Sequence, residues 1–135
     1  FYGLLIRIVH QSLNFKVLNM HSLFLDPDKW DLFVDKNGKI ANCYAEYAIA
    51  QNVANACRLF IKDAYYDEDR GIPHFALELK EQPSIDILKN RLRDAALEVE
   101  GVADAQVNQL TTEGRMLVCQ MLIQLNDGTM INVAI

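Results

Sequence analysis

The stretch MLVCQMLIQLNDGTMINVAI, residues 116–135, decides the fold that we expect for this chain. It contains two apolar runs, 116–125 and 130–135, separated by residues 126–129, and an Asp-Gly pair between such runs is typical of a β-hairpin. Alternate residues of a strand lie on the same face. One face of the first run should therefore belong to the core: Leu117, Cys119, Met121, Ile123 and Leu125, with Gln120 and Gln124 on the opposite face.

Two helices are predicted upstream of this hairpin. Over residues 44–62, apolar side chains recur at spacings of three or four, which predicts a helix with one buried stripe. A second helix should begin at Ser84 as the N-cap and end before Gly101, after which residues 102–110 have the pattern of a strand. The expected buried positions are Ala45, Ile49, Val53, Ala56 and Phe60 in the first helix, and Ile85, Leu88, Leu92, Ala95 or Ala96, and Val99 in the second.

A further turn signal lies near the start of the chain. Asn37 and Gly38 separate the short β-prone pieces 30–34 and 40–41, which predicts a small hairpin. Trp30 is a candidate anchor for a partner, although we expect it to cap the core. The expected fold class is therefore α+β, with two main helices packed on a small, mostly antiparallel sheet that ends in a C-terminal β-hairpin.

Composition limits the possible classes of protein. A chain of 135 residues is the size of one domain, and a net charge of −5 disfavours a nucleic-acid binder that neutralises phosphates. No apolar run reaches the roughly 18 residues that a membrane helix needs, so we expect no membrane insertion. Cys43, Cys57 and Cys119 are odd in number and show no C-x-x-C spacing, which favours buried thiols in a reducing compartment.

Residues 1–19 differ in composition from the rest of the chain. They contain Arg7 and Lys16 but no acidic residue, whereas residues 20–135 carry the other 11 basic residues and all 18 acidic ones. We expect residues 20–135 to form the single domain. Residues 1–19 are expected to be an extension, either non-native or an arm that packs on a neighbour.

The stretch DEDRGIPHF, residues 67–75, follows the first predicted helix and is the best functional clue. It places Arg70 beside a Gly-x-Pro turn, between carboxylates and the aromatic residues Tyr65, Tyr66 and Phe75. Proline fixes the backbone and arginine supplies directional donors, so this pattern predicts a rigid docking surface rather than a catalytic centre.

Enzymatic alternatives have weaker support in the sequence. Two carboxylates among Glu46, Asp67, Glu68 and Asp69 could serve as the acid and the base or nucleophile of a peptidoglycan-cleaving glycosidase. Charged loop residues are more often only solvated, and no nucleophile elbow, P-loop or dinucleotide motif occurs. Calcium-loop and zinc-ligand spacings are incomplete, so we predict no metal and no cofactor.

Several short stretches of residues 20–135 point to a known family. These stretches are LDPDKWDL at 25–32, DKNGKIA at 35–41, AQNV at 50–53, YD at 66–67 with RGIP at 70–73, and VEGV at 99–102. With them, the chain resembles the small baseplate wedge proteins of contractile phage and prophage tails. These proteins form the sheath-initiator family and are sometimes labelled tail lysozyme, although the domain they share is structural.

The resemblance implies two partner-binding surfaces. A Glu-Pro-Arg-type loop docks on the wedge core in the family, and residues 69–73 occupy the corresponding place here without a literal Glu-Pro-Arg triplet. Family members also offer a strand to the tail sheath by β-addition, which would match the edge of residues 129–135. The expected partner-binding residues are Tyr66, Asp69, Arg70, Gly71, Ile72 and Pro73 in the loop, and Met130, Asn132 and Ala134 in the strand.

The expected function follows from this resemblance. It implies a noncatalytic subunit of a contractile-tail baseplate, assembled in the bacterial host cytoplasm, that docks other wedge proteins and helps to initiate the sheath. Its partners would be those wedge proteins together with the sheath protein or proteins near the tail tube. The alternatives are a peptidoglycan-cleaving tail lysozyme and a free protein-binding adaptor with the same fold.

Overall fold

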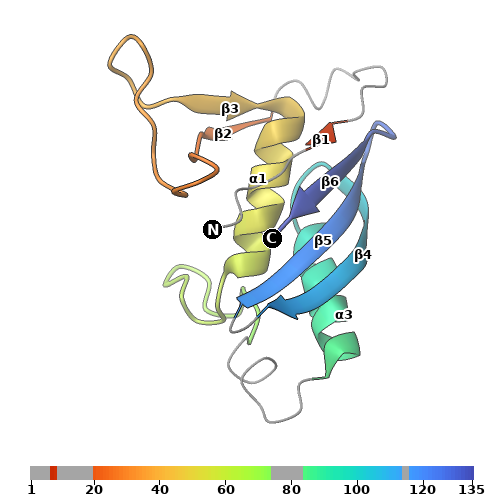
Figure 1. Cartoon of the computed structure of the whole chain (residues 1–135). Coiled ribbons are helices and arrows are strands. Elements are labelled where there is room, and N and C mark those ends of the chain that lie inside the picture. Colours follow the sequence, from red (N-terminus) through yellow and green to blue (C-terminus); the bar gives the residue numbers. More distant parts are fainter. Residues whose placement is uncertain (1–6, 9–19, 74–83, 114–115) are drawn as a thin grey trace.

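The structure, a computed structural model, describes residues 7–8, 20–73, 84–113 and 116–135. Two helices pack with a four-stranded antiparallel sheet whose order is β1-β6-β5-β4 (Figure 1). The fold class is α+β, as the sequence predicts. The helices are α1 (Ala45–Arg58) and α3 (Ile85–Leu97), and the strands are β1 (Arg7–Ile8), β4 (Val102–Glu113), β5 (Met116–Leu125) and β6 (Met130–Ala134).

The C-terminal hairpin forms as its turn residues require. Gly128 has a φ of +88°, which glycine adopts without strain. Its N–H donates to the carbonyl of Leu125, and the Leu125 N–H donates to the carbonyl of Thr129 at 2.8 Å. This closure sets the register that pairs Ile123 with Ile131, which places both side chains in the core.

The core lies between one face of the sheet and the two helices. Helix α3 packs on β4 and on α1, and α1 also contacts β6. The predicted inward face of β5 is confirmed, since Cys119, Met121, Ile123 and Leu125 are buried and Leu117 is partly buried against them. Gln120 and Gln124 are exposed on the other face.

Helix α1 differs from its prediction in two ways. It ends at Arg58, because Leu59 turns extended and leads into a backbone bridge between Phe60 and Ile72. The helix is also buried on several faces rather than along one stripe, since β2 and β3 pack on it as well as α3 and β6. The abundant alanines of α1 suit this position because they allow close approach of its neighbours.

Helix α3 follows its prediction at most positions. It begins directly after Ser84, which occupies the N-cap position without a side-chain cap bond. Leu88, Leu92, Ala96 and Val99 are buried. Ile85 is 54% exposed, so its predicted place in the core was wrong. It is the first residue of the helix, and the buried face of the helix begins only at Leu88.

Residues 21–44 form a separate layer, which we call the arm. Its base is a two-stranded antiparallel sheet of β2 (His21–Leu23) and β3 (Asn42–Tyr44). Beyond this sheet, an antiparallel bridge joins Val34 to Ile40, which confirms the small hairpin predicted around Gly38. In Figure 1 the arm projects on the side of α1 away from the four-stranded sheet.

Helix α1 holds the arm through polar contacts. The buried Gln51 side chain accepts from the Leu25 N–H at 2.9 Å and donates to the Leu23 carbonyl at 2.6 Å. Trp30 is partly buried against the core, as predicted, and its indole N–H donates to Asn55 Oδ1 at 3.1 Å. The Arg58 guanidinium lies 4.3 Å from the centre of the Trp30 ring, a cation–π distance.

The predicted N-terminal extension is described at two positions only. There, β1 pairs with β6 so that Arg7 faces Asn132 and Ile8 faces Ile131. The other residues of 1–19 lie outside the described ranges. None of the helices within those ranges combines the length and apolarity needed to cross a bilayer.

Candidate docking surfaces

Residues 59–73, which we call the docking loop, form a closed loop after α1. The Ile72 N–H donates to the Leu59 carbonyl at 2.9 Å, and the Ile61 N–H donates to the Ile72 carbonyl at 3.0 Å. These two bonds form the parallel bridge between Phe60 and Ile72 and hold the ends of the loop together. Compact loops whose ends meet in this way are frequently functional.

Gly71 makes this closure possible. Its φ is +115°, and a Cβ at this position would lie 2.6 Å from the Phe60 carbonyl oxygen. Only glycine fits so close to another backbone segment with this conformation. Within the loop, the Asp67 N–H donates to the Ala64 carbonyl and the Arg70 N–H donates to the Asp67 carbonyl. The loop therefore has a fixed course.

The outer face of the docking loop is aromatic and charged. Tyr65 and Tyr66 are 89% and 72% exposed, and their rings meet edge to face with centroids 5.4 Å apart. Asp69 and Arg70 are also exposed. Aromatic residues and arginine are enriched among the residues that dominate binding at protein interfaces. Here both are exposed on a fixed backbone.

The structure corrects one residue of the predicted loop surface. Ile72 is only 2% exposed and belongs to the core, because its backbone bridge to Phe60 turns its side chain inward. Gly71 and Pro73 are half-buried, and the predicted contribution of Phe75 lies outside the described residues. The docking face of the loop thus consists of Tyr65, Tyr66, Asp69 and Arg70.

The predicted second surface, along β6, is less open than expected. Strand β6 lies between β5 and β1, so its outer edge is already paired at Ile131 and Asn132. Met130 is 38% exposed, whereas Asn132 and Ala134 are half-buried. The expectation of an unpaired edge on β6 is therefore wrong at Ile131 and Asn132, because β1 pairs with β6 there.

The carboxylates of the enzymatic alternative are not all close together. Glu46 is buried in the first turn of α1, whereas Asp67, Glu68 and Asp69 are exposed in the loop that follows the last turn. A helix rises about 1.5 Å per residue, so about 18 Å of helix separates Glu46 from the start of that loop. Glu46 therefore does not pair with a loop carboxylate, and the glycosidase alternative stays a prediction for the loop residues alone.

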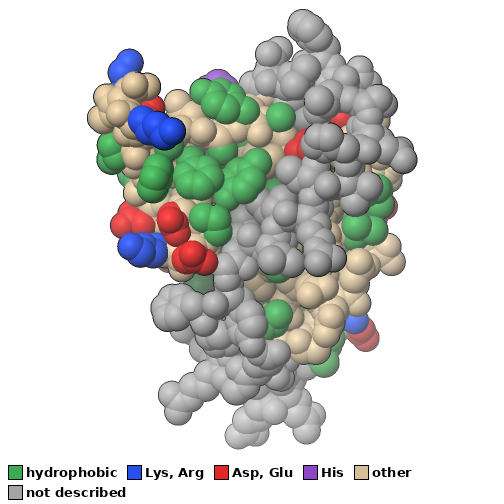
Figure 2. Space-filling view, turned by 45° about the horizontal axis from the view of Figure 1, so that its top comes forward, with side chains coloured by type: hydrophobic (Ala, Val, Ile, Leu, Met, Phe, Trp, Pro, Cys, Tyr) green, Lys and Arg blue, Asp and Glu red, His purple; other side chains and the backbone are tan. Residues whose placement is uncertain are grey.

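The arm carries an apolar surface that was not predicted from the sequence. Leu32, Phe33, Val34 and Ile40 are 50–59% exposed, and we call these four side chains the apolar band. Figure 2 shows hydrophobic side chains gathered on the arm, with basic side chains on one side of them and several acidic side chains beside a basic one on the other. The signal in the sequence was the unbroken run of residues 32–34, which lacks the alternation of a strand with one solvated face.

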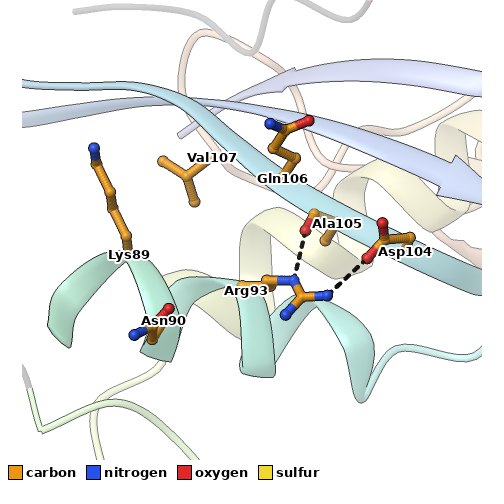
Figure 3. A pocket seen from close by; sticks show the side chains of 7 residues that line it. All are labelled: Lys89, Asn90, Arg93, Asp104, Ala105, Gln106 and Val107. Atoms are coloured by element: carbon orange, nitrogen blue, oxygen red, sulfur yellow. Dashed lines mark hydrogen bonds and ion pairs between the residues drawn. The ribbon is translucent and has the colours of Figure 1, made fainter. Parts of the chain in front are cut away.

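A shallow hollow of about 320 Å³ lies between α3 and β4 (Figure 3). The Arg93 Nε donates to the Ala105 carbonyl at 3.0 Å, and a terminal nitrogen of Arg93 lies 3.0 Å from Asp104 Oδ1. The hydrogen bond from Arg93 lowers the pKa of the Asp104 carboxyl. Arg93 thus occupies a backbone acceptor on the outer strand of the sheet, and edge strands are commonly protected by charges of this kind.

The three cysteines are buried, as predicted. Burial raises the pKa of Cys57 to about 12, and of Cys119 to about 11. Both thiols therefore stay protonated at neutral pH and have the environment of packing residues.

Comparison with known proteins identifies no family for this sequence. No protein-family model matches this sequence, and no curated protein matches it significantly. The proposed function therefore depends on the resemblance noted in the sequence and on the geometry of the docking loop.

Proposed function

We propose that this protein is a noncatalytic structural subunit of a contractile-tail baseplate, which docks wedge proteins and helps to initiate the sheath. The observation that carries the proposal is the docking loop, closed at its base by the Phe60–Ile72 bridge, with Arg70 and two tyrosines on its outer face. The sequence resemblance, which assigns wedge docking to residues 69–73 of this loop, supports the proposal.

The geometry of the loop suits the formation of a specific contact. A loop that already holds its bound conformation loses less conformational entropy on association than a mobile one. Arg70 can form paired, charge-assisted hydrogen bonds with a carboxylate of the partner, while Tyr65 and Tyr66 supply apolar area at low entropic cost. The loop therefore combines a directional group with a rigid aromatic surface.

Sheath initiation is the second part of the proposal. A sheath strand that added to β6 at Ile131 and Asn132 would have to displace β1, which pairs with both residues. Met130 remains accessible at the start of β6. The proposal thus places wedge docking on the loop and allows strand addition to β6 only with movement of β1.

The test is incorporation of an Arg70→Ala variant into tail particles in the organism that encodes the chain. We expect the amount of this variant per particle to fall about tenfold, the effect of losing one interface residue worth about 1.4 kcal/mol. Arg91→Ala is the matched control, because Arg91 is an exposed arginine on α3, away from the loop. Normal incorporation of Arg70→Ala would remove the docking role from the loop.

A turbidity assay on bacterial cell walls separates this proposal from the enzymatic alternative. We expect neither the wild-type protein nor the Asp67→Asn and Glu68→Gln variants to clear the suspension. Clearing by the wild type that either variant abolishes would overturn the proposal, since it would assign catalysis to loop carboxylates.

A further inference from the structure

The apolar band on the arm lies between two turns of opposite charge. An antiparallel bridge joins Val34 to Ile40 at one end of strand residues 32–34, and another joins Leu25 to Leu32 at the other end. The first bridge leads into residues 35–39, which we call the lysine turn. The second leads into residues 26–31, which we call the acidic turn.

The lysine turn presents positive charge. Lys36 and Lys39 are exposed. The carboxylate of Asp35 is half-buried and accepts the N–H groups of Asn37 at 2.8 Å and Lys39 at 3.0 Å. The lysine turn therefore carries two basic groups and one acidic group, a net charge of +1, and both ammonium groups are exposed.

The acidic turn presents net negative charge. It contains Asp26, Asp28 and Asp31 against the single base Lys29. Asp28 and Asp31 are exposed, and one oxygen of Asp31 accepts the Leu32 N–H at 2.7 Å. One oxygen of Asp26 accepts the N–H groups of Asp28 and Lys29, so the turn keeps a net charge of −2. Figure 2 shows basic side chains at one end of the arm, hydrophobic ones in the middle, and several acidic side chains with a basic one beyond them.

We propose that this surface binds a second copy of the chain, with the two arms antiparallel about a two-fold axis. In such a pairing the two apolar bands cover each other, and each lysine turn meets the acidic turn of the other copy. A parallel pairing would place like charges together, which is unfavourable. The arm is thus complementary to itself in one orientation, and this inference does not depend on the docking loop.

The order of side chains disfavours a membrane as the occupant. Lys36 and Lys39 lie in the turn beyond the Val34–Ile40 bridge, at one end of the apolar band. A bilayer that received the band face-on would also meet the exposed Asp28 and Asp31 of the acidic turn, which an anionic lipid surface repels. A second arm in the antiparallel orientation offers a lysine turn there and has no such cost.

The first experiment is sedimentation velocity of the full chain over a wide range of concentration. We expect a reversible monomer–dimer equilibrium that weakens as salt is raised, because the paired turns lie at the exposed ends of the interface. A protein that remains monomeric at all concentrations would contradict the proposal. Monomeric protein that co-sediments with vesicles of anionic lipid would contradict it too, and would assign the lysine turn to lipid headgroups.

Charge exchange tests the antiparallel arrangement. The tip variant carries Lys36→Glu and Lys39→Glu, and the base variant carries Asp28→Lys and Asp31→Lys. Each variant alone should dimerise at least about tenfold more weakly than the wild type, whereas an equimolar mixture should form a heterodimer, since opposite charges then meet again at both ends. Failure of the mixture to associate, with both variants folded by circular dichroism, would overturn the arrangement.

Removal of apolar side chains tests the band itself. Val34→Ser with Ile40→Ser should raise the dimer dissociation constant by more than about tenfold, because each substitution acts twice in a two-fold interface. Ile85→Ser with Ile87→Ser is the matched control, since these side chains on α3 are exposed to a similar degree. Equal dissociation constants for the two double variants would show that the band is not the interface.

Discussion

At the scale of single residues, Gly71 is the position on which the docking loop depends. Its positive φ and its contact with the Phe60 backbone let the chain return to the end of α1. The turn near Gly71 was predictable because Gly and Pro mark turns. The pairing of Ile72 with Phe60 was not predictable, because the residues between them have no strand pattern that would indicate which backbone groups meet.

We predict that Gly71→Ala destabilises the protein by about 2 to 4 kcal/mol, because the new Cβ would both strain the backbone and overlap the Phe60 carbonyl. Urea unfolding measures the change. Gly38→Ala is the matched control, since Gly38 also has a positive φ but no atom within 4 Å of its would-be Cβ. It should cost only about 1 kcal/mol. Equal losses in the two variants would contradict the close packing at Gly71.

The buried thiols predict a pH dependence. The pKa of Cys57 is raised to about 12 and that of Cys119 to about 11, whereas an unfolded thiol ionises at about 8.5. The unfolded state therefore loses protons first, so stability is fully present below about pH 8.5 and decreases as the pH rises toward these values, by up to about 1.4 kcal/mol per thiol per pH unit.

We expect Cys57→Ala with Cys119→Ala to reduce this alkaline decline, although the double variant starts from a lower stability because it leaves cavities in the core. Urea unfolding at neutral pH and at about pH 10 gives the slope for each protein. The same slope in variant and wild type would show that neither thiol accounts for the decline.

At the scale of elements, β5 and α3 were predictable because their local patterns agree with their surroundings. Strand β5 alternates between core and solvent, and α3 buries one face. Helix α1 was predicted too long and too amphipathic. The helix ends where the chain pairs with the distant backbone of Ile72, and its additional burial comes from packing against the arm. A local sequence pattern shows neither of these contacts.

The attachment of the arm to α1 gives a prediction at this scale. Gln51→Leu removes the partners of the Leu25 N–H and the Leu23 carbonyl, which should cost about 2 to 3 kcal/mol. Hydrogen exchange should speed up most at Leu25. Gln120→Leu is the matched control, because Gln120 is exposed on the sheet, and it should change stability by less than about 0.5 kcal/mol. Unchanged exchange at Leu25 would mean that Gln51 does not hold the arm.

At the scale of the whole molecule, the two contact surfaces have different origins. The docking loop was recognisable in the sequence because Arg, Gly, Pro and Tyr occur together there. The apolar band was not, because Leu32, Phe33 and Val34 could equally have formed a buried strand. In the structure the arm lies on the side of α1 away from the four-stranded sheet (Figure 1). The three side chains are about half exposed there, so no described element covers them fully.

The central proposal is that this protein is a structural subunit of a contractile-tail baseplate. Electron microscopy of tail particles from the organism that encodes the chain, with an antibody against an epitope tag on the protein, tests it most directly. We predict label at the baseplate end of the particles, and much less label with Arg70→Ala than with Arg91→Ala. Intact particles without label on the wild-type protein would contradict the claim.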